Sequence, residues 1–309
     1  MSEREAAEAA ARPTSLGVIG LGVMGAPIAR RLSAKGFGPQ VADPDPRTIQ
    51  LYIMEGGANP AATARHLAQM STVLVMALTD ADVLREAVTG TNGIVHSVKP
   101  GTIVIDMGGG DPESGVALAR TLATRGAAWV EAVPVGTPQQ TASGALTILA
   151  GGPNGPLDKV APVLEALAGE RVIRTGPVGS ASLARSLAGL LSAARLAATT
   201  EAMIVAKRFG MEPAAALQAM EAASPDRVSP LPASAEEARA KPPAAGYSLT
   251  RAIVDIDTVR DTAARSGVPL PVSATLREIC VAARLNLEGS DELAALVQWL
   301  ERISRTPLS

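Results

Sequence analysis

Aromatic side chains are scarce in this sequence, since only 2% of its 309 residues are Phe, Trp or Tyr. A core of this composition must be aliphatic, and we expect many alanine contacts between helices. Cys280 is the single cysteine, which excludes a framework of internal disulfides and fits a reducing compartment. His66 and His96 are the only histidines, so a zinc site of His and Cys ligands is not expected. We therefore assign these three residues to structural or surface positions and predict no metal site.

Neither sign of charge dominates the chain. Its formal net charge is −2, so it lacks the basic excess that is typical of nucleic-acid binding. No apolar run approaches the length of a membrane span, and the N-terminus lacks a signal-peptide pattern. We therefore expect a cytoplasmic protein with no nucleic-acid or membrane partner. The length is sufficient for two domains.

The first part of the chain alternates short apolar runs with helical patterns. The apolar runs predict strands at Leu16–Ile19, Gln40–Ala42, Thr72–Ala77, Thr102–Ile105, Ala128–Val130, Ala145–Leu149 and Val172–Arg174. The helical patterns between them lie at Pro46–Glu55, Asp80–Val88, Pro112–Arg125 and Leu157–Ala168. Such alternation predicts an α/β fold with a doubly wound, mostly parallel sheet.

Strand signals stop at Gly179, and the remaining chain reads as helices. Ser180–Phe209 is one long pattern rich in Ala and Leu. Further helices are predicted at Pro213–Ala223, Leu249–Arg265, Val272–Leu285 and Asp291–Ile303. The segment Ser224–Gly246 is rich in Pro, Ser and Ala and predicts a loop with a short helix. We expect a flexible tail at 1–14, an α/β domain at 15–178 and an all-helical domain at 179–309.

The segment Leu16–Arg30 carries the most informative motif, in which an apolar strand leads through a glycine-rich turn into a helix. The turn has the pattern G-x-G-x-x-G, and its residues are Gly20, Leu21, Gly22, Val23, Met24 and Gly25. The first glycine permits the tight turn, the second lets the backbone approach a pyrophosphate, and the third lets the helix pack on the strand. The helix N-terminus then offers N–H groups to that anion. The segment predicts a dinucleotide-binding α/β domain; the alternative is a turn that binds nothing.

Two other segments extend the predicted cofactor site. Asp43 ends the second strand, where an acid accepts a hydrogen bond from the ribose 2′-hydroxyl and repels a 2′-phosphate. This favours NAD, with NADP as the alternative because Arg47 lies close by; the segment Asp43-Pro44-Asp45-Pro46 can also simply cap the next helix. Leu78, Thr79 and Asp80 follow the third strand and face the carboxyl edge of the sheet. For Asp80 the alternative is a plain N-cap.

Several segments in order resemble the β-hydroxyacid dehydrogenase family, which has relatives in 6-phosphogluconate dehydrogenase and the imine reductases. The resemblance covers most of the chain after residue 15 and is carried by GLGVMGAPIARRL (20–32), LTDADVLREAVTGTNGI (78–94), IVIDMGG (103–109), SGALTILAGG (143–152), TGPVGSASLARSL (175–187) and YSLTRAIVDIDTV (247–259). It implies an N-terminal Rossmann domain, a long interdomain helix, an all-α C-terminal domain and a homodimer. It also implies hydride transfer between NAD(P) and a small hydroxyacid or its carbonyl, bound in the cleft between the domains.

The positions that would carry catalysis depart from the family pattern. The D-x-S-T turn that approaches the nicotinamide ends here in Gly108 and Gly109. The serine that precedes a double glycine in the substrate-binding motif is replaced, since the motif reads Val135-Gly136-Thr137. The family lysine on the interdomain helix falls at Arg185, and the amide pair after it is Ala188-Gly189. The Lys-Asp pair of the C-terminal helix is Val254-Asp255, so only the acid remains.

These replacements change the chemistry that we expect. Arginine cannot exchange a proton near neutral pH, because its pKa lies above about 12. Arg185 can instead bind a carboxylate in a bidentate manner or stabilise a developing oxyanion. Asp255 is the expected partner of Arg185, and a purely structural ion pair between them is the alternative. Gly136, Thr137 and Gly189 are expected to line the substrate site beside the apolar Val135, and Tyr247 or water is the candidate proton donor.

The resulting hypothesis is an NAD(P)-dependent oxidoreductase that acts on a carbonyl/alcohol or imine/amine substrate without the family lysine. One alternative is a protein that binds the dinucleotide without redox turnover, as a degenerate enzyme or sensor. A second is a non-redox lyase that uses the cofactor transiently. Turnover of reduced cofactor with a panel of ketoacids, aldehydes and imines distinguishes the enzyme from the binding protein.

Overall fold

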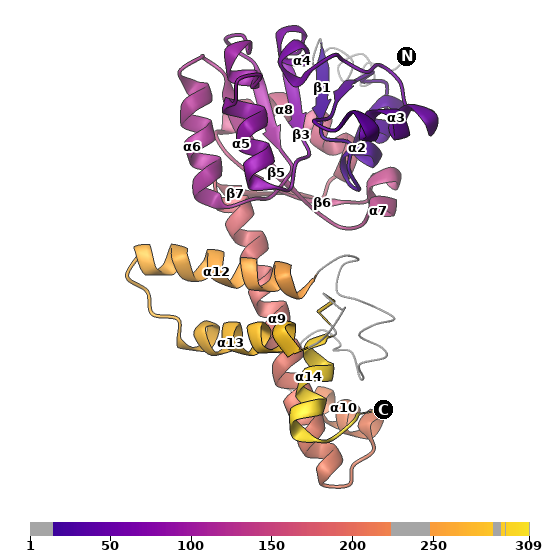
Figure 1. Ribbon diagram of the computed structural model, residues 1–309, viewed down its shortest axis with the longest axis vertical. Helices are drawn as coiled ribbons and strands as arrows, with labels where there is room; N and C mark the ends of the chain where they lie inside the picture. Colours follow the sequence, from indigo (N-terminus) through magenta and orange to yellow (C-terminus); the bar gives the residue numbers. More distant parts are fainter. Residues whose placement is uncertain (1–14, 224–247, 287–291, 294, 309) are drawn as a thin grey trace. The chain divides into compact units, whose positions relative to one another are not determined.

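The computed structural model describes residues 15–223, 248–286, 292–293 and 295–308. The chain divides into two compact units, Met1–Arg185 and Ser186–Ser309. Helix α9 (Ser180–Arg208) contributes its first residues to one unit and the rest to the other (Figure 1). The boundary predicted at 178/179 lies immediately before this helix, whereas the division between the units lies inside it.

The first unit is built around a seven-stranded sheet in the order β2-β1-β3-β4-β5-β6-β7. The strands are β1 (Leu16–Ile19), β2 (Gln40–Ala42), β3 (Val73–Met76), β4 (Ile103–Asp106), β5 (Ala128–Val135), β6 (Thr147–Gly151) and β7 (Val172–Gly176). Every neighbouring pair is parallel except β5 and β6. This confirms the doubly wound, mostly parallel sheet. The strand order reverses at β1, which is where open α/β sheets bind ligands.

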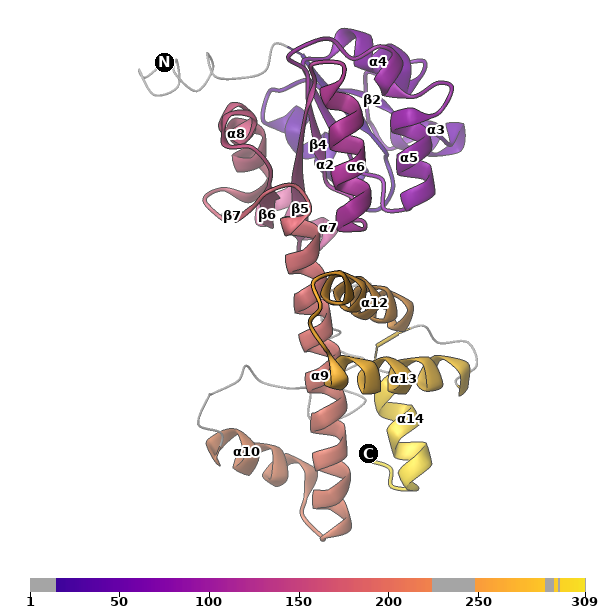
Figure 2. The same ribbon diagram turned by 90° about the vertical axis from the view of Figure 1, so that its left-hand side faces the viewer.

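Helices cover both faces of this sheet (Figures 1 and 2). One layer contains α2 (Gly25–Ala34) and α8 (Asn154–Ala168), and the other contains α4 (Ala64–Met70), α5 (Ala81–Thr89) and α6 (Pro112–Ala123). The unit also contains α3 (Pro46–Met54), α7 (Pro138–Ser143) and the 3₁₀ turn η1 (Ile94–His96). Helices α4 and α7 and the turn η1 were not expected from the sequence, because such short elements give a weak periodic signal.

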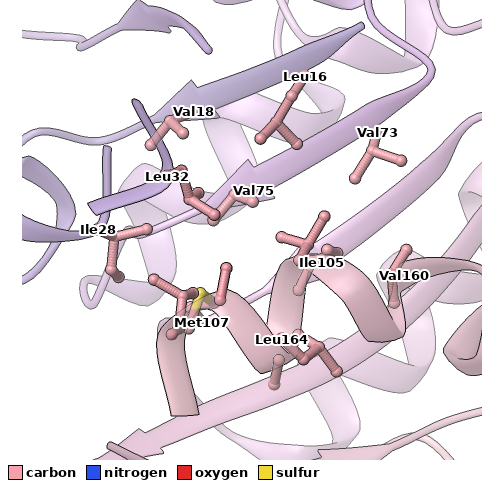
Figure 3. Packing of buried hydrophobic residues seen from close by; sticks show 14 of the residues in the cluster. Leu16, Val18, Ile28, Leu32, Val73, Val75, Ile105, Met107, Val160 and Leu164 are labelled. Carbon is pink, nitrogen blue, oxygen red and sulfur yellow. The ribbon is translucent and has the colours of Figure 1, made fainter. Parts of the chain in front are cut away.

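The core between the sheet and α2 and α8 is aliphatic, as expected. Leu16 and Val18 of β1 and Val75 of β3 lie toward Ile28 and Leu32 of α2 (Figure 3). These side chains are at most 3% exposed. Burial of each contributes roughly 1.5–3 kcal/mol. Because β1 and α2 are fixed by this packing, the glycine turn between them is held on both sides.

The second unit is all-helical within the described residues. After the C-terminal part of α9 it contains α10 (Pro213–Ala223), α12 (Leu249–Arg265), α13 (Pro271–Asn286) and α14 (Ala295–Ser304). Figure 1 shows α12 and α13 side by side, and their buried residues include Ile256, Leu276 and Cys280. The all-helical prediction is confirmed for these segments. The predicted loop Ser224–Gly246 lies outside the described residues.

Helix α9 is long and apolar, although no apolar run of membrane-span length was expected from the sequence. By length and composition it passes the test for a membrane-crossing helix, with a mean hydropathy of 1.2 over its most apolar window. Core helices of water-soluble proteins pass the same test, and 39% of that window is buried. A single such helix is therefore weak evidence for a membrane span.

Candidate dinucleotide site

The glycine-rich turn between β1 and α2 requires glycine at two positions. Gly20 has φ +95°, and a Cβ added there would lie 2.6 Å from the carbonyl oxygen of Ala77. A Cβ at Gly25 would lie 2.0 Å from the carbonyl oxygen of Gly20. No side chain fits at either position, so these two glycines close the turn and bring α2 against the sheet.

Gly22 has different surroundings. A Cβ added there would meet no described atom within 4 Å. Within the described helix α2, no side chain caps the N-terminus and no acidic residue lies in the first turn. Open space above a glycine, beside a helix N-terminus without an acid, suits a pyrophosphate. The turn therefore fits the phosphates of a dinucleotide. Leu21 is buried, and Val23 is exposed.

Asp43 braces the glycine turn from the end of β2. Its Oδ2 accepts a hydrogen bond from the Leu21 N–H at 2.7 Å, and its Oδ1 accepts one from the Asp45 N–H at 2.8 Å. The N-cap of α3 is Asp45, which also pairs with the exposed Arg47. The segment Asp43–Pro46 thus caps α3, as the alternative expected, but through Asp45 and not through the Asp43 side chain. Because each carboxylate oxygen has two lone pairs, Asp43 can still accept a bond from a ribose hydroxyl.

The loop after β3 lies beside the turn. Leu78 is buried, and its side chain is one of the groups that a Cβ at Gly20 would touch. Thr79 and Asp80 are exposed. The Asp80 carboxylate accepts hydrogen bonds from the N–H groups of Asp82 and Val83, at 2.9 and 3.0 Å, as the N-cap of α5. Asp80 is thus the N-cap of α5, and its role in cofactor binding stays a prediction.

The turn after β4 lies against the same loop. A Cβ at Gly108 would lie 2.0 Å from the carbonyl oxygen of Leu78, so only glycine lets the two loops approach this closely. Gly109 has φ +62°, and its carbonyl accepts a hydrogen bond from Arg185 Nη2 at 2.8 Å. The structure therefore brings together the glycine turn, Leu78, Gly108, Gly109 and Arg185.

Two buried acids beside this turn received no role from the sequence. Asp106, at the end of β4, is 2% exposed, and Glu131 on β5 is 0% exposed. Burial raises the pKa of Asp106 to about 7; the hydrogen bond from the Gly108 N–H opposes this shift, and the charge of Glu131 adds to it. Burial also raises the pKa of Glu131, against the effect of its hydrogen bonds. A lone acid in each of two apolar strands was the signal that could have identified them.

Three residues predicted for the substrate site lie between the end of β5 and the start of α7. Val135 ends β5 with 44% of its surface exposed, and Gly136 follows with φ +148°. Thr137 is the N-cap of α7 and forms a capping box with Gln140, so its hydroxyl has a structural role. Tyr247 lies outside the described residues.

Two predicted site residues belong to the second unit. Gly189 is buried in α9. Asp255 is buried in α12, where it pairs with Arg251 at 3.2 Å and accepts a hydrogen bond from Ser186 Oγ at 3.2 Å. This carboxylate therefore has structural partners within its own unit.

A cavity of about 120 Å³ lies between α5 and α6, and its lining includes Leu78, Thr79, Asp106, Gly110 and Asp111. A larger hollow of about 950 Å³ is lined by residues of α6, α8 and β7, none of which is a predicted site residue. Among the described residues, no group of three or more His, Cys, Asp or Glu side chains could hold a metal ion.

Two family models match the chain. The model described as the NAD binding domain of 6-phosphogluconate dehydrogenase matches residues 15–176. The model described as NAD-binding of NADP-dependent 3-hydroxyisobutyrate dehydrogenase matches residues 179–300. Together they cover both units.

Characterised proteins resemble the chain over nearly its whole length. It is 24% identical to 2-(hydroxymethyl)glutarate dehydrogenase of Eubacterium barkeri, over 95% of this chain and 97% of that protein. It is 29% identical to L-threonate dehydrogenase of Cupriavidus necator, over 92% and 95% of the two chains. In fold, it is similar to a structure of Mycobacterium tuberculosis 3-hydroxyisobutyrate dehydrogenase with L-serine, with a TM-score of 0.81, 22% identity and coverage of 93% and 99%.

Proposed function

Because the chain belongs to the β-hydroxyacid dehydrogenase family and is an NAD(P)-dependent oxidoreductase, we propose that it oxidises or reduces a small anionic substrate that Arg185 anchors, without the family lysine. The observation that carries this proposal is the bond between Arg185 Nη2 and the Gly109 carbonyl. It fixes a permanent cation at the turn that approaches the nicotinamide in the resembled family.

The residues of the glycine turn and its neighbours have separate roles in cofactor binding. The backbone at Gly22 and the N-terminus of α2 hold the pyrophosphate, and Asp43 accepts a hydrogen bond from the ribose. Leu78, Thr79, Gly108 and Gly109 border the nicotinamide end. The carboxylate of Asp43 repels a 2′-phosphate, which favours NAD over NADP. The bound nicotinamide supplies or accepts the hydride.

Arg185 performs a different task from a lysine at the same position. Its guanidinium remains charged at working pH, so it binds a carboxylate or stabilises negative charge on the reacting oxygen, but it does not transfer a proton. We propose that water provides or accepts the proton. Near the substrate, the exposed Val135 offers an apolar surface where the family has a hydroxyl.

The substrate class follows from the cation and from the relatives. The names of the relatives, 2-(hydroxymethyl)glutarate dehydrogenase and L-threonate dehydrogenase, describe small hydroxyacids. A carboxylate of such a substrate is a suitable ligand for Arg185. We propose a small hydroxyacid and its carbonyl as the substrate pair, and an imine/amine pair as the second candidate.

The test measures NADH binding by fluorescence and NADH oxidation by absorbance with ketoacids, aldehydes and imines. Arg185→Ala should retain NADH binding and raise KM for a carboxylate substrate on the order of 100-fold, since a charge-assisted pair is worth roughly 1.5–3 kcal/mol. Arg174→Ala, which removes a half-exposed arginine that pairs with Asp158, is the matched control. Unchanged KM in Arg185→Ala would refute the anchor. Tight NADH binding without turnover across the panel would favour the binding-protein alternative.

We further propose that two copies of the chain associate through the second unit. Large apolar side chains among its described residues are exposed, including Leu191, Val205, Phe209, Val272 and Leu285. Exposed apolar surface of this kind is typical of an interface. Light scattering should give the mass of a dimer, and Leu191→Glu should shift it toward a monomer; a monomeric wild type would refute the proposal. We also propose a cytoplasmic location, which fits the single buried thiol.

A further inference from the structure

Asp106 and Glu131 occupy neighbouring strands and point to the same face of the sheet. Their Cα atoms are register partners in the parallel pair of β4 and β5, and register partners in parallel strands project to one face. Helix α6 covers this face. A Cβ added at Gly115 of α6 would lie 3.6 Å from Glu131 Oε1, so the helix packs closely over the acid. Two carboxyl groups therefore share one buried site.

Glu131 holds the first turn of α9. Its Oε2 accepts hydrogen bonds from the N–H groups of Gly179 at 2.7 Å and Ala181 at 3.2 Å, and its Oε1 accepts one from Ser182 Oγ at 2.6 Å. A helix N-terminus leaves N–H groups without helical partners, and this carboxylate satisfies them from another strand. The turn fixed in this way directly precedes Arg185.

Asp106 holds the turn that receives the Arg185 guanidinium. Its Oδ1 accepts a hydrogen bond from the Gly108 N–H at 2.9 Å. The next residue is Gly109, whose carbonyl accepts the bond from Arg185. One acid thus positions the helix that carries the guanidinium, and the other positions the carbonyl that binds it.

We propose that Asp106 and Glu131 form a positioning pair that holds Arg185 at the nicotinamide turn, and that the protonation of Asp106 adjusts this position. The functional importance of the pair rests on the proposed anchoring role of Arg185. Neither acid touches the substrate in this proposal, because both act through backbone groups and the helix.

The charge state of the pair follows from its surroundings. Glu131 accepts three hydrogen bonds, which stabilise its ionised form, whereas Asp106 accepts one from Gly108. Two adjacent buried carboxylates repel each other, so the pair retains one proton, on Asp106, at pH values below about 7. Among the described residues that line the same cavity as Asp106, the other charged ones are Arg85 of α5 and Asp111 before α6. Ionisation of Asp106 strengthens its bond with Gly108.

The test uses the full chain, labelled with ¹⁵N, and no ligand. Substitution by Arg185→Lys assigns the Arg185 Nε–H signal, and a glycine-labelled sample assigns the Gly108 amide. In the wild type we expect both signals to shift with pH around a common midpoint near 7. Asp106→Asn retains an acceptor for Gly108 but cannot ionise, so it should abolish both titrations. Glu131→Gln should move the midpoint to lower pH, because the neighbouring negative charge is lost.

The control is Val104→Ala, which shortens a buried side chain on the same strand and leaves both carboxyl groups and the turn residues unchanged. It should leave both titrations in place. A Gly108 signal that titrates while the Arg185 signal does not would refute the positioning role, and so would titrations that persist in Asp106→Asn. These readouts need no turnover, so they can succeed even if the substrate tests of Arg185 fail. If Asp106→Asn does not fold, the wild-type titration and its shift in Glu131→Gln still decide the proposal.

Discussion

The Asp43 carboxylate lies 2.7 Å from the Leu21 N–H, so the acid at the end of β2 is bonded directly to the glycine turn. This bond connects two parts of the cofactor site that the sequence presents separately. The acid that is proposed to select the ribose also braces the backbone proposed to hold the pyrophosphate.

Replacement of Asp43 should therefore affect both affinity and selectivity. Asp43→Ala should weaken NADH binding on the order of tenfold or more, since a hydrogen bond to a charged group is worth roughly 1.5–3 kcal/mol. It should weaken NADPH binding less, so the NADPH/NADH affinity ratio rises. Fluorescence titrations with both cofactors measure this. The control is Asp45→Ala, which removes the N-cap of α3. It should cost about 1 kcal/mol of stability and leave the NADPH/NADH affinity ratio unchanged. A wild-type affinity ratio in Asp43→Ala would contradict the ribose role.

Substitution by alanine should affect cofactor binding at Gly22 and folding at Gly25. Gly22→Ala adds a methyl group in open space, so the melting temperature should remain near that of the wild type while NADH affinity falls at least about tenfold. Gly25→Ala forces a contact of 2.0 Å with the Gly20 carbonyl, so the fold itself should be destabilised. Thermal melts with NADH titrations separate the two effects. Normal NADH affinity in Gly22→Ala would show that the pyrophosphate does not approach there.

Asp106 should make stability depend on pH. Its pKa is raised from 3.8 to about 7 in the folded protein, so between these values the folded state binds more protons than the unfolded state. Stability contributed by this group is therefore greatest at low pH and falls as pH rises toward 7, by up to roughly 1.4 kcal/mol per pH unit. Urea unfolding from pH 5 to pH 8 measures the slope.

Asp106→Asn should flatten this slope, because asparagine does not ionise. It should be more stable than the wild type at pH 8, where the wild type must bury a second charge. Val104→Ala, in the same strand, should lower stability at every pH and leave the slope unchanged. Equal slopes for the wild type and Asp106→Asn would rule out the assigned protonation.

The cap that Glu131 provides should be costly to remove. Glu131→Ala leaves the buried Gly179 and Ala181 N–H groups without this acceptor, and we expect a loss of roughly 3 kcal/mol or more. Ser182→Ala removes one donor and leaves the two backbone bonds, so it should cost less, about 1–2 kcal/mol. Urea unfolding of both variants compares them, and a smaller loss for Glu131→Ala than for Ser182→Ala would argue against the cap.

The sequence was most informative where the signal is local. The strand Leu16–Ile19 and the helix Leu249–Arg265 were predicted with their observed bounds, because period and flanking residues define them. The family resemblance selected the glycine turn, Leu78, Gly108 and Arg185, and the structure brings these residues together. Their roles in binding stay predictions.

Other features depend on how distant segments meet. The pairing of Asp106 with Glu131 requires β4 and β5 to be adjacent and in one register, and neither fact is encoded in either strand alone. The antiparallel course of β6 depends on the α7 connection, which is too short to give a clear period. That Asp80 caps α5 is seen only in the hydrogen bonds themselves.

Glu131 also affects how this fold can be divided and recombined. Its three donors lie at residues 179–182, beyond the last strand of the sheet. A truncation of the chain before Gly179 would leave the buried Glu131 carboxylate without these three donors, whereas a truncation after Arg185 would retain them. The first turns of α9 thus belong structurally with the nucleotide-binding unit. A chimaera that joins this unit to the helical domain of a relative should therefore have its junction after Arg185.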